Sequence, residues 1–200
     1  MKFKNIFITG STGVVGKPIF LKLINQGHNV FALSRNTKNE DFIRTNKAEV
    51  VNGDLFSENI YSQLKDKSID AIFHVAGANQ KCQKDPSSMH KTNIEGTKKI
   101  LELGNNLQIK KFIYTSSAVT LGEQKGKIGN EKSDHRGSFL SDYEESKFLA
   151  EQVAFAFNKN FEFVSINPSS VQGPGRISGT AKLLISTLNK KFPPLIKSSV

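Results

Sequence analysis

A tyrosine and a lysine four residues apart could share one catalytic site. Tyr143 and Lys147 fall within residues 140–158, a stretch whose pattern predicts a helix. Residues four apart lie on the same helical face, so a protonated Lys147 would lower the pKa of the Tyr143 phenol. The phenol could then exchange a proton with a carbonyl or alcohol oxygen. The spacing is also common on the surfaces of amphipathic helices, so it needs support from elsewhere in the chain.

Two serines at the end of a predicted strand supply a hydroxyl that such chemistry needs. Ser116 and Ser117 directly follow an apolar run, residues 111–115. Parallel sheets bind their ligands at the carboxyl edge, so a serine there could hold the reacting oxygen beside Tyr143. An ordinary strand-end turn is the alternative explanation for the pair.

A glycine-rich turn near the start of the chain suggests where a cofactor would bind. Gly10, Gly13 and Gly16 lie between a predicted strand, residues 5–9, and a predicted helix, residues 13–26. These glycines would permit a tight turn, close approach to a pyrophosphate, and close helix–strand packing, respectively. The helix N-terminus would offer N–H groups to the phosphates, although three purely structural glycines are the alternative. The residues expected to contact the dinucleotide here are Gly10, Thr12, Gly13, Val14, Val15 and Gly16.

The tip of the second predicted strand, residues 29–33, bears on which dinucleotide is bound. Many sites place an acidic residue there to bind the ribose 2′-hydroxyl, but this chain has Arg35, with Lys38 nearby. An arginine can pair with a 2′-phosphate, so the sequence favours NADP(H), with NAD(H) possible. An exposed arginine without a ligand is the alternative. Asp54 could accept a hydrogen bond from the adenine amino group, or could form a local Asx turn.

Short apolar runs alternate with helical patterns along the chain, which predicts βαβ units and a parallel sheet. The predicted strands cover residues 5–9, 29–33, 49–51, 71–75, 111–115 and 161–166. The predicted helices cover residues 13–26, 38–46, 57–65, 86–105, 140–158 and 180–190. Residues 120–138 form a polar loop that is long enough to suggest a function.

The composition excludes several classes of protein. A chain of 200 residues with 37% hydrophobic content is neither a collagen, a coiled coil nor wholly disordered. No apolar stretch is long enough to span a membrane, and the single cysteine, Cys82, cannot form an internal disulfide. These features predict a cytoplasmic location. The net charge of +10 is spread along the chain, which favours a solvated lysine-rich surface over a nucleic-acid site.

These motifs together resemble the extended short-chain dehydrogenase/reductases, a group of NAD(P)-dependent epimerases, dehydratases and dihydroflavonol-reductase-like enzymes. The further matching segments are Gly53-Asp54-Leu55, His74-Val75-Ala76-Gly77, Asn93-Ile94-Glu95-Gly96-Thr97, Thr115-Ser116-Ser117-Ala118 and Asn167-Pro168-Ser169-Ser170-Val171. All the motifs occur in the family's order and cover nearly the whole chain. The resemblance is greater to the dihydroflavonol-reductase-like branch than to the sugar epimerases.

The resemblance implies a role for individual residues. Ser117, rather than Ser116, matches the catalytic serine, and Tyr143 matches the general acid/base. Lys147 matches the residue that binds the nicotinamide ribose and tunes Tyr143, and Asn93 matches an asparagine that supports the lysine side of the site. No metal site is implied, and the strand-end histidine of the His74 motif is expected to be packed rather than catalytic. The other implied cofactor-binding residues are Arg35, Asp54, Leu55, Val75, Ala76, Gly77, Thr115, Pro168, Ser170 and Val171, together with Tyr143 and Lys147.

The implied fold is α/β, a Rossmann-type doubly wound parallel sheet of about six strands. Residues 1–179 would form the NAD(P)-binding domain, and residues 180–200 would be a stub of the substrate-binding region. Family members continue for another hundred residues or more, so most of the substrate-binding domain is expected to be absent. Residues 161–166 would then form an exposed sheet edge, and the last helix would expose Leu183, Leu184 and Leu188.

The expected function is hydride transfer between a nicotinamide cofactor, with NADPH favoured, and a carbonyl or alcohol substrate. Tyr143 would act as the general acid/base. One alternative is a nucleotide-sugar epimerase or dehydratase, and another is a dinucleotide-binding module without turnover. The expected partner is a small carbonyl or sugar-nucleotide substrate, with neither nucleic acid nor membrane. The resemblance also makes a homodimer possible.

Overall fold

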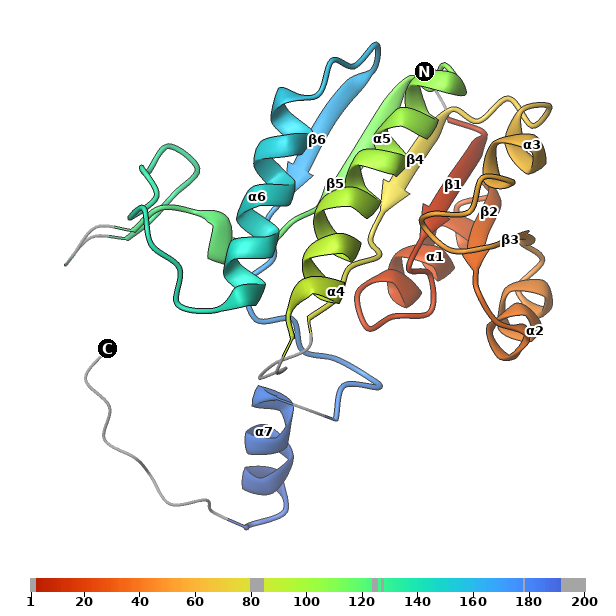
Figure 1. Ribbon diagram of the computed structural model, residues 1–200. Coiled ribbons are helices and arrows are strands. Elements are labelled where there is room, and N and C mark those ends of the chain that lie inside the picture. The colour runs from red at the N-terminus through yellow and green to blue at the C-terminus, as the bar shows by residue number, and fades with distance from the viewer. Residues whose placement is uncertain (1–2, 80–84, 124–125, 127, 178, 192–200) are drawn as a thin grey trace. The chain divides into compact units, whose positions relative to one another are not determined.

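The computed structural model describes residues 3–79, 85–123, 126, 128–177 and 179–191 (Figure 1). These residues belong to two compact units, one that ends at Ser169 and one that begins at Ser170. Within the described ranges, no helix combines the length and the apolar character that a membrane crossing requires. Cys82, for which an unpaired state is expected, lies outside the described residues.

The first unit is built on a six-stranded parallel sheet with the strand order β3-β2-β1-β4-β5-β6. The strands are β1 (Asn5–Thr9), β2 (Asn29–Ser34), β3 (Glu49–Asn52), β4 (Ala71–His74), β5 (Lys111–Thr115) and β6 (Glu162–Ile166). The order reverses between β1 and β4, which is the switch point at which doubly wound sheets bind ligands. The predicted fold class is therefore confirmed.

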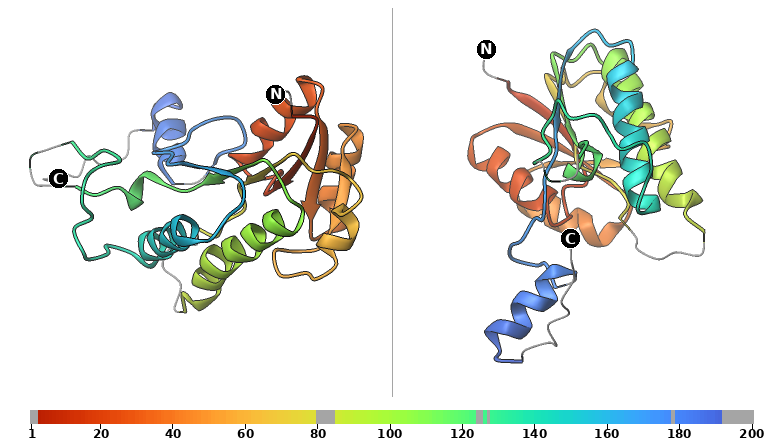
Figure 2. Two further views of the ribbon diagram at one scale, coloured as in Figure 1. Left: turned by 90° about the horizontal axis from the view of Figure 1, so that it is seen from above. Right: turned by 90° about the vertical axis from the view of Figure 1, so that its left-hand side faces the viewer.

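Helices cover both faces of this sheet (Figure 2). They are α1 (Gly16–Asn25), α2 (Thr37–Thr45), α3 (Ile60–Leu64), α4 (Ser87–His90), the π-helix η1 (Lys91–Glu95), α5 (Gly96–Asn106), the 3₁₀-helix η2 (Ala118–Thr120) and α6 (Asp142–Ala156). Figure 2 shows α5 and α6 side by side on one face, with α1 on the other. This arrangement is the layered architecture that alternating strands and helices predict.

Alternation along the strands divides the apolar side chains between two cores. Phe7 of β1 belongs to the core that includes Leu101 of α5 and Ala150 of α6. Its neighbour Ile8 belongs to the second core, together with Phe20 of α1. Because successive side chains of a strand point to opposite faces, a short apolar run such as β1 can fill both layers.

Helix boundaries differ from the predictions where local hydrogen bonds compete with the helix. α1 begins at Gly16 rather than at residue 13, because Gly13 N donates to Gly10 O (3.1 Å) and the turn continues to that point. The helix ends at Asn25, with Gln26 as its C-cap, and the expected Gly27 follows with a φ of 80° that suits a glycine. The N–H groups of Gly27 and His28 donate to helix carbonyls. The predicted regular helix over residues 86–105 is interrupted by the π-turn of η1.

Among the described residues, β6 is the outermost strand on one side of the sheet, as expected. Ile166, the last residue of this edge strand, is about half exposed. The second unit contains α7 (Thr180–Leu188). As expected, its three leucines are exposed, with Leu188 at 82%. Within this unit Gln172 Nε2 donates to the Thr180 hydroxyl at 2.5 Å, which links the preceding loop to the start of the helix.

Asp70 joins the amino ends of three strands and gives a testable contribution to stability. Its carboxylate accepts hydrogen bonds from the backbone N–H groups of Lys4 (2.8 Å) and Asn5 (3.0 Å) and from Lys110 Nζ (2.5 Å). Burial alone would raise the Asp70 pKa, but the hydrogen bonds from Lys110, Asn5 and Lys4 outweigh it and lower the pKa to about 2. The contribution to stability is therefore complete above the ordinary value of 3.8 and is lost as the pH falls towards 2.

Asp70→Asn should lower the free energy of unfolding at pH 7 by about 1 to 2 kcal/mol. The difference from the unmodified chain should shrink as the pH falls from about 4 towards 2, because the native carboxylate also becomes neutral there. Urea unfolding at several pH values measures this. A loss that is the same at every pH would show that the charge of Asp70 makes no contribution.

Candidate functional site

Three of the predicted site segments lie at the carboxyl edge of the sheet. The glycine-rich turn follows β1, residues 75–77 follow β4, and Ser116 and Ser117 follow β5 (Figure 1). β4 lies between β1 and β5, so the three segments are neighbours along this edge. The strand order thus brings together motifs that are far apart in the sequence.

The glycine-rich turn has two glycines that the backbone requires and one that it does not. Gly10 has a φ of +72°, and a Cβ there would lie 2.7 Å from Ala76 N. A Cβ on Gly16 would overlap the carbonyl oxygen of Gly10, whereas a Cβ on Gly13 would meet that oxygen at an ordinary 3.4 Å. The fold therefore leaves Gly13 open to a functional explanation, such as close approach of a ligand.

This turn presents the beginning of α1 to solvent. Thr12, Gly13 and Val14 are exposed, Val15 is partly exposed, and no side chain caps the N-terminus of α1. Uncapped N–H groups at a helix N-terminus are suited to bind phosphate. Ser11, which the sequence did not single out, is buried here with a hydroxyl that has no partner among the described residues.

The tip of β2 presents a cation. Arg35 follows β2 directly and is exposed, as is Lys38 in the first turn of α2. The next residue, Asn36, caps α2 by accepting a hydrogen bond from Asn39 N at 3.1 Å. The backbone of Arg35 is thus held between a strand end and a capped helix while its side chain reaches solvent.

Two residues expected near the adenosine have local structural contacts. Asp54 Oδ1 accepts hydrogen bonds from Phe56 N (2.9 Å) and Ser57 Oγ (3.1 Å), which is the Asx turn that the sequence left open. Leu55 is buried in the core and lies against Gly96, where an added Cβ would be 2.7 Å from the leucine Cδ1. Cofactor contacts of both residues remain predictions.

The segment after β4 is fixed through the last residue of β1. Ala76 N donates to Thr9 Oγ1 (3.2 Å), and the same hydroxyl lies 2.8 Å from His74 Nδ1. Burial, and then the nearby charge of Lys147, lower the pKa of His74 to about 3, so this side chain is neutral. The expectation that His74 is a packed residue is confirmed. Val75 is partly buried and Gly77 is exposed beside it.

The side chain of Lys147, a residue of α6, is buried against the end of β5. Tyr143, one turn before it in α6, is half-buried, and the helix is capped there by Ser141, whose Oγ accepts from Glu144 N (3.2 Å). Lys147 Nζ donates to Thr115 O (2.8 Å) and to Tyr114 Oη (3.1 Å). Burial lowers the pKa of Lys147 to about 8, although the charge of Glu151 opposes this effect.

Tyr114 is a site residue that the sequence analysis missed. It is fully buried, its ring stacks on His74 with centroids 5.8 Å apart, and burial raises its pKa above the ordinary value. The phenol is therefore protonated and acts as a neutral partner of Lys147. Alternation along residues 111–116, which puts Tyr114 on the same face as Ser116, is the pattern that could have identified it.

Asn93 supports α6 rather than contacting Lys147 directly. It lies in η1, and its side-chain Oδ1 accepts from Ala78 N at 2.7 Å. Its Nδ2 donates to Ala78 O (3.0 Å) and to Ser146 Oγ (2.9 Å). Asn93 thereby joins the segment after β4 to the residue before Lys147, and a π-turn at such a position is typical of functional sites.

The two serines after β5 differ in their hydrogen bonds. Ser117 caps η2, and its Oγ accepts from Val119 N at 3.5 Å, which leaves the hydroxyl proton available. Ser116 Oγ is buried without a partner in the described part of the chain. The segment is held from β6, since Ser116 N donates to Ile166 O (2.8 Å) and Ala118 N donates to Pro168 O (2.9 Å). Ser170 and Val171 belong to the second unit.

The long loop before α6 is attached beside Tyr143. Glu144 is buried and accepts hydrogen bonds from the Arg136 guanidinium and from Leu140 N (3.0 Å). Arg136 also pairs with Glu123 near the other end of the loop. A buried carboxylate next to Tyr143 therefore holds one end of a loop for which the sequence suggests a function, and Arg136 connects that end to Glu123.

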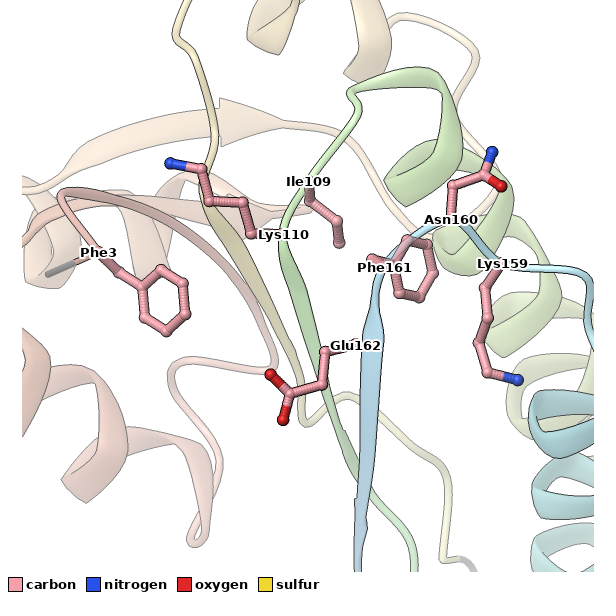
Figure 3. Close-up of a pocket in the computed structure, with 7 residues that line it drawn as sticks. All are labelled: Phe3, Ile109, Lys110, Lys159, Asn160, Phe161 and Glu162. Atoms are coloured by element: carbon pink, nitrogen blue, oxygen red, sulfur yellow. The ribbon is translucent and has the colours of Figure 1, made fainter. Parts of the chain in front are cut away.

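A hollow of about 770 Å³ lies at the amino ends of the strands, opposite to the carboxyl ends that carry the site (Figure 3). Its lining residues are Phe3, Ile109, Lys110, Lys159, Asn160, Phe161 and Glu162. The charged groups there already have partners: Lys110 pairs with Asp70, and Glu162 pairs with Lys111. The hollow lies at the amino ends of β5 and β6, and it contains none of the predicted site residues.

Comparison with known proteins agrees with the fold. Residues 6–194 match the family described as "NAD dependent epimerase/dehydratase family". The "Putative dihydroflavonol 4-reductase" of Synechocystis sp. PCC 6803 is 29% identical over 97% of this chain and 57% of that protein. The dihydroflavonol 4-reductase of Solanum lycopersicum is 28% identical over 94% of this chain and 55% of that protein. The crystal structure of gox2253 has a TM-score of 0.82 at 29% identity and covers 95% of this chain and 59% of that one.

The chain thus spans somewhat more than half the length of these relatives. The family match extends over the glycine-rich turn, all six strands and the helix that carries Tyr143 and Lys147. This chain belongs to the family of NAD-dependent epimerases and dehydratases, which includes NAD(P)-dependent reductases.

Proposed function

We propose that this chain is the cofactor-binding and catalytic part of an NADP(H)-preferring oxidoreductase that acts on a carbonyl or alcohol. The observation that carries the proposal is the position of Lys147. Its buried ammonium is held at the carbonyl of Thr115, two residues before Ser117 and one helical turn from Tyr143. This position supports a site in which an acid/base tyrosine, a cation and a serine hydroxyl act together at the ligand-binding edge of the sheet.

Each of these side chains has a part in the reaction. The Tyr143 hydroxyl gives its proton to the substrate carbonyl oxygen during reduction and takes it back during oxidation. The positive charge of Lys147 stabilises the phenolate that remains after the proton has left. The Ser117 Oγ accepts from Val119 N, so its own O–H can donate to the substrate oxygen and hold it beside Tyr143. A bound nicotinamide would supply or accept the hydride.

The residues of the glycine-rich turn fit a dinucleotide. The exposed backbone at Thr12, Gly13 and Val14 and the uncapped start of α1 would bind the pyrophosphate. Arg35, exposed at the end of β2, would pair with the 2′-phosphate of NADP(H). We take residues 1–179 as the dinucleotide-binding domain and a cytoplasmic location as part of the same proposal.

The preference for NADPH is tested by equilibrium binding of NADPH and NADH to the chain and to its Arg35→Ala variant. A charge-assisted pair of about 1.5 to 3 kcal/mol predicts a tenfold to hundredfold preference for NADPH, which Arg35→Ala should remove. Arg44→Ala is the matched control, because Arg44 is an exposed arginine of α2 paired with Glu40. It should leave the preference unchanged.

The outcomes separate the three functions. Tighter binding of NADH, with epimerisation of a nucleotide sugar, would replace the reductase by the epimerase or dehydratase alternative. Binding of NADPH without turnover of any carbonyl compound would leave a dinucleotide-binding module. Binding of neither nucleotide would contradict the proposal.

A further inference from the structure

A second buried charge lies on the helix that carries Tyr143 and Lys147. Glu151 follows Lys147 by four residues, so the two residues lie on one face of α6. Glu151 is 6% exposed. Glu151 Oε1 accepts hydrogen bonds from Ser165 Oγ of β6 (2.5 Å) and from Asn167 Nδ2 (2.9 Å). A buried carboxylate is costly to desolvate, so its partners need an explanation.

The hydrogen bonds of Asn167 continue from Glu151 to the backbone of Ser117. Asn167 Nδ2 also donates to Thr120 Oγ1 (2.9 Å) and to Ser117 O (3.2 Å). The Thr120 hydroxyl donates to the same Ser117 carbonyl at 2.9 Å. Three oxygen acceptors around one amide nitrogen fix the orientation of the Asn167 side chain, because the opposite orientation would put its oxygen against a carboxylate. Glu151 thus holds the segment that carries the Ser117 hydroxyl.

The charge of Glu151 also acts on Lys147. The titratable groups that act on the ammonium or contact it are the neutral His74 of β4, the protonated Tyr114 of β5 and Glu151 of α6 itself. Tyr143 of α6 acts on Tyr114. Among them Glu151 is the group that favours the charged lysine, and it opposes the effect of burial on the Lys147 pKa. Removal of this charge would leave the ammonium with dipolar partners alone, the carbonyl of Thr115 and the phenol of Tyr114.

We infer that Glu151 is a positioning residue of the site, which supplies a buried negative charge one helical turn from Lys147 and, through Asn167, holds the backbone of Ser117 in place. The part that Glu151 would play in catalysis rests on the proposed function, whereas its contacts with Ser165 and Asn167 are independent of that proposal. Glu151 would not touch the substrate or the cofactor. It would act through the two residues that do.

Glu151→Gln and Ser165→Ala separate the charge from the hydrogen bonds. Glutamine keeps an oxygen that can accept from Ser165 and Asn167 but removes the charge. Ser165→Ala keeps the charge but removes the hydroxyl, which donates to Glu151 and lies 3.5 Å from Asn167 Oδ1. The deprotonation midpoint of Lys147 can be followed by NMR of isotopically labelled lysine side chains, assigned by the signal lost in Lys147→Arg. From a value near 8, the midpoint should fall by about one pH unit in Glu151→Gln and stay in place in Ser165→Ala.

This titration needs no cofactor, so it is independent of the proposed function. A midpoint that does not move in a folded Glu151→Gln variant overturns the inference, even if NADPH binds. A midpoint that moves in a chain that binds no nucleotide supports the inference and contradicts the function. If the inference and the proposed function are both correct, the pH above which NADPH binding is lost should shift together with the Lys147 midpoint.

Glu151→Asp covers the case in which Glu151→Gln does not fold. The shorter side chain keeps the charge but cannot maintain both hydrogen bonds. The Lys147 midpoint should therefore stay nearly unchanged, while the backbone amide signals of Ser117 and Ala118 move. Unchanged amide signals, or a midpoint that falls despite the retained charge, would contradict the inference.

Discussion

Gly16→Ala is expected to destabilise the chain by more than about 3 kcal/mol. The added Cβ would overlap the carbonyl oxygen of Gly10 and lie 2.8 Å from its carbonyl carbon. Gly10 has little room to move away, because the backbone of Ala76 lies close beside it: a Cβ added to Gly10 would be 2.7 Å from Ala76 N. The Cβ added to Gly16 would therefore meet main-chain atoms, which a change of side-chain conformation cannot move away. Urea unfolding followed by circular dichroism measures the loss.

Gly13→Ala is the matched control within the same turn. Its Cβ would meet the Gly10 oxygen at 3.4 Å, so the free energy of unfolding should change by less than about 1 kcal/mol. NADPH affinity should nevertheless fall at least about tenfold, because a methyl group would stand where the backbone approaches the pyrophosphate. Equal destabilisation by both substitutions would contradict the geometry of the turn. Unchanged NADPH binding by Gly13→Ala would place the phosphates elsewhere.

The strands could be predicted closely because their apolar runs are short and bounded by polar or glycine residues. β5 has the predicted bounds, Lys111–Thr115, and each other strand differs at most slightly at an end. The π-turn of η1 could not be predicted, because it depends on contacts across the fold. The Asn93 side chain forms hydrogen bonds with the backbone of Ala78, which belongs to the segment after β4. No periodicity within residues 86–105 encodes that partner.

The site shows the same division between local and distant contacts. The spacing of Tyr143 and Lys147 is visible in the sequence, since a helix places residues four apart on one face. Tyr114 and Glu151 were missed because their importance arises from neighbours on other elements, Lys147 for the first and Asn167 for the second. Asp54 is a case in which a local contact was foreseen. The sequence allowed either an adenine contact or an Asx turn, and the Asx turn is present, with one carboxylate oxygen accepting from Phe56 N.

Tyr143→Phe should lower kcat for carbonyl reduction by about a hundredfold to ten-thousandfold, with little change in NADPH affinity. The substitution removes one oxygen from a half-buried side chain in the first turn of α6. The helix cap at Ser141 and the contacts of Lys147 do not involve that oxygen. The fold and the cation should therefore remain while the proton donor is lost.

The measurement is kcat over a panel of ketones and aldehydes with NADPH, beside the dissociation constant of NADPH for the same variants. Tyr61→Phe is a suitable control, because Tyr61 is an exposed tyrosine of α3 and its substitution should leave both quantities unchanged. A fall of less than tenfold in Tyr143→Phe would assign the proton transfer to another group. A large fall together with weaker NADPH binding would mean that the tyrosine orders the cofactor as well. Loss of kcat alone is the result that separates general acid/base catalysis from binding, because only the transition state needs the proton.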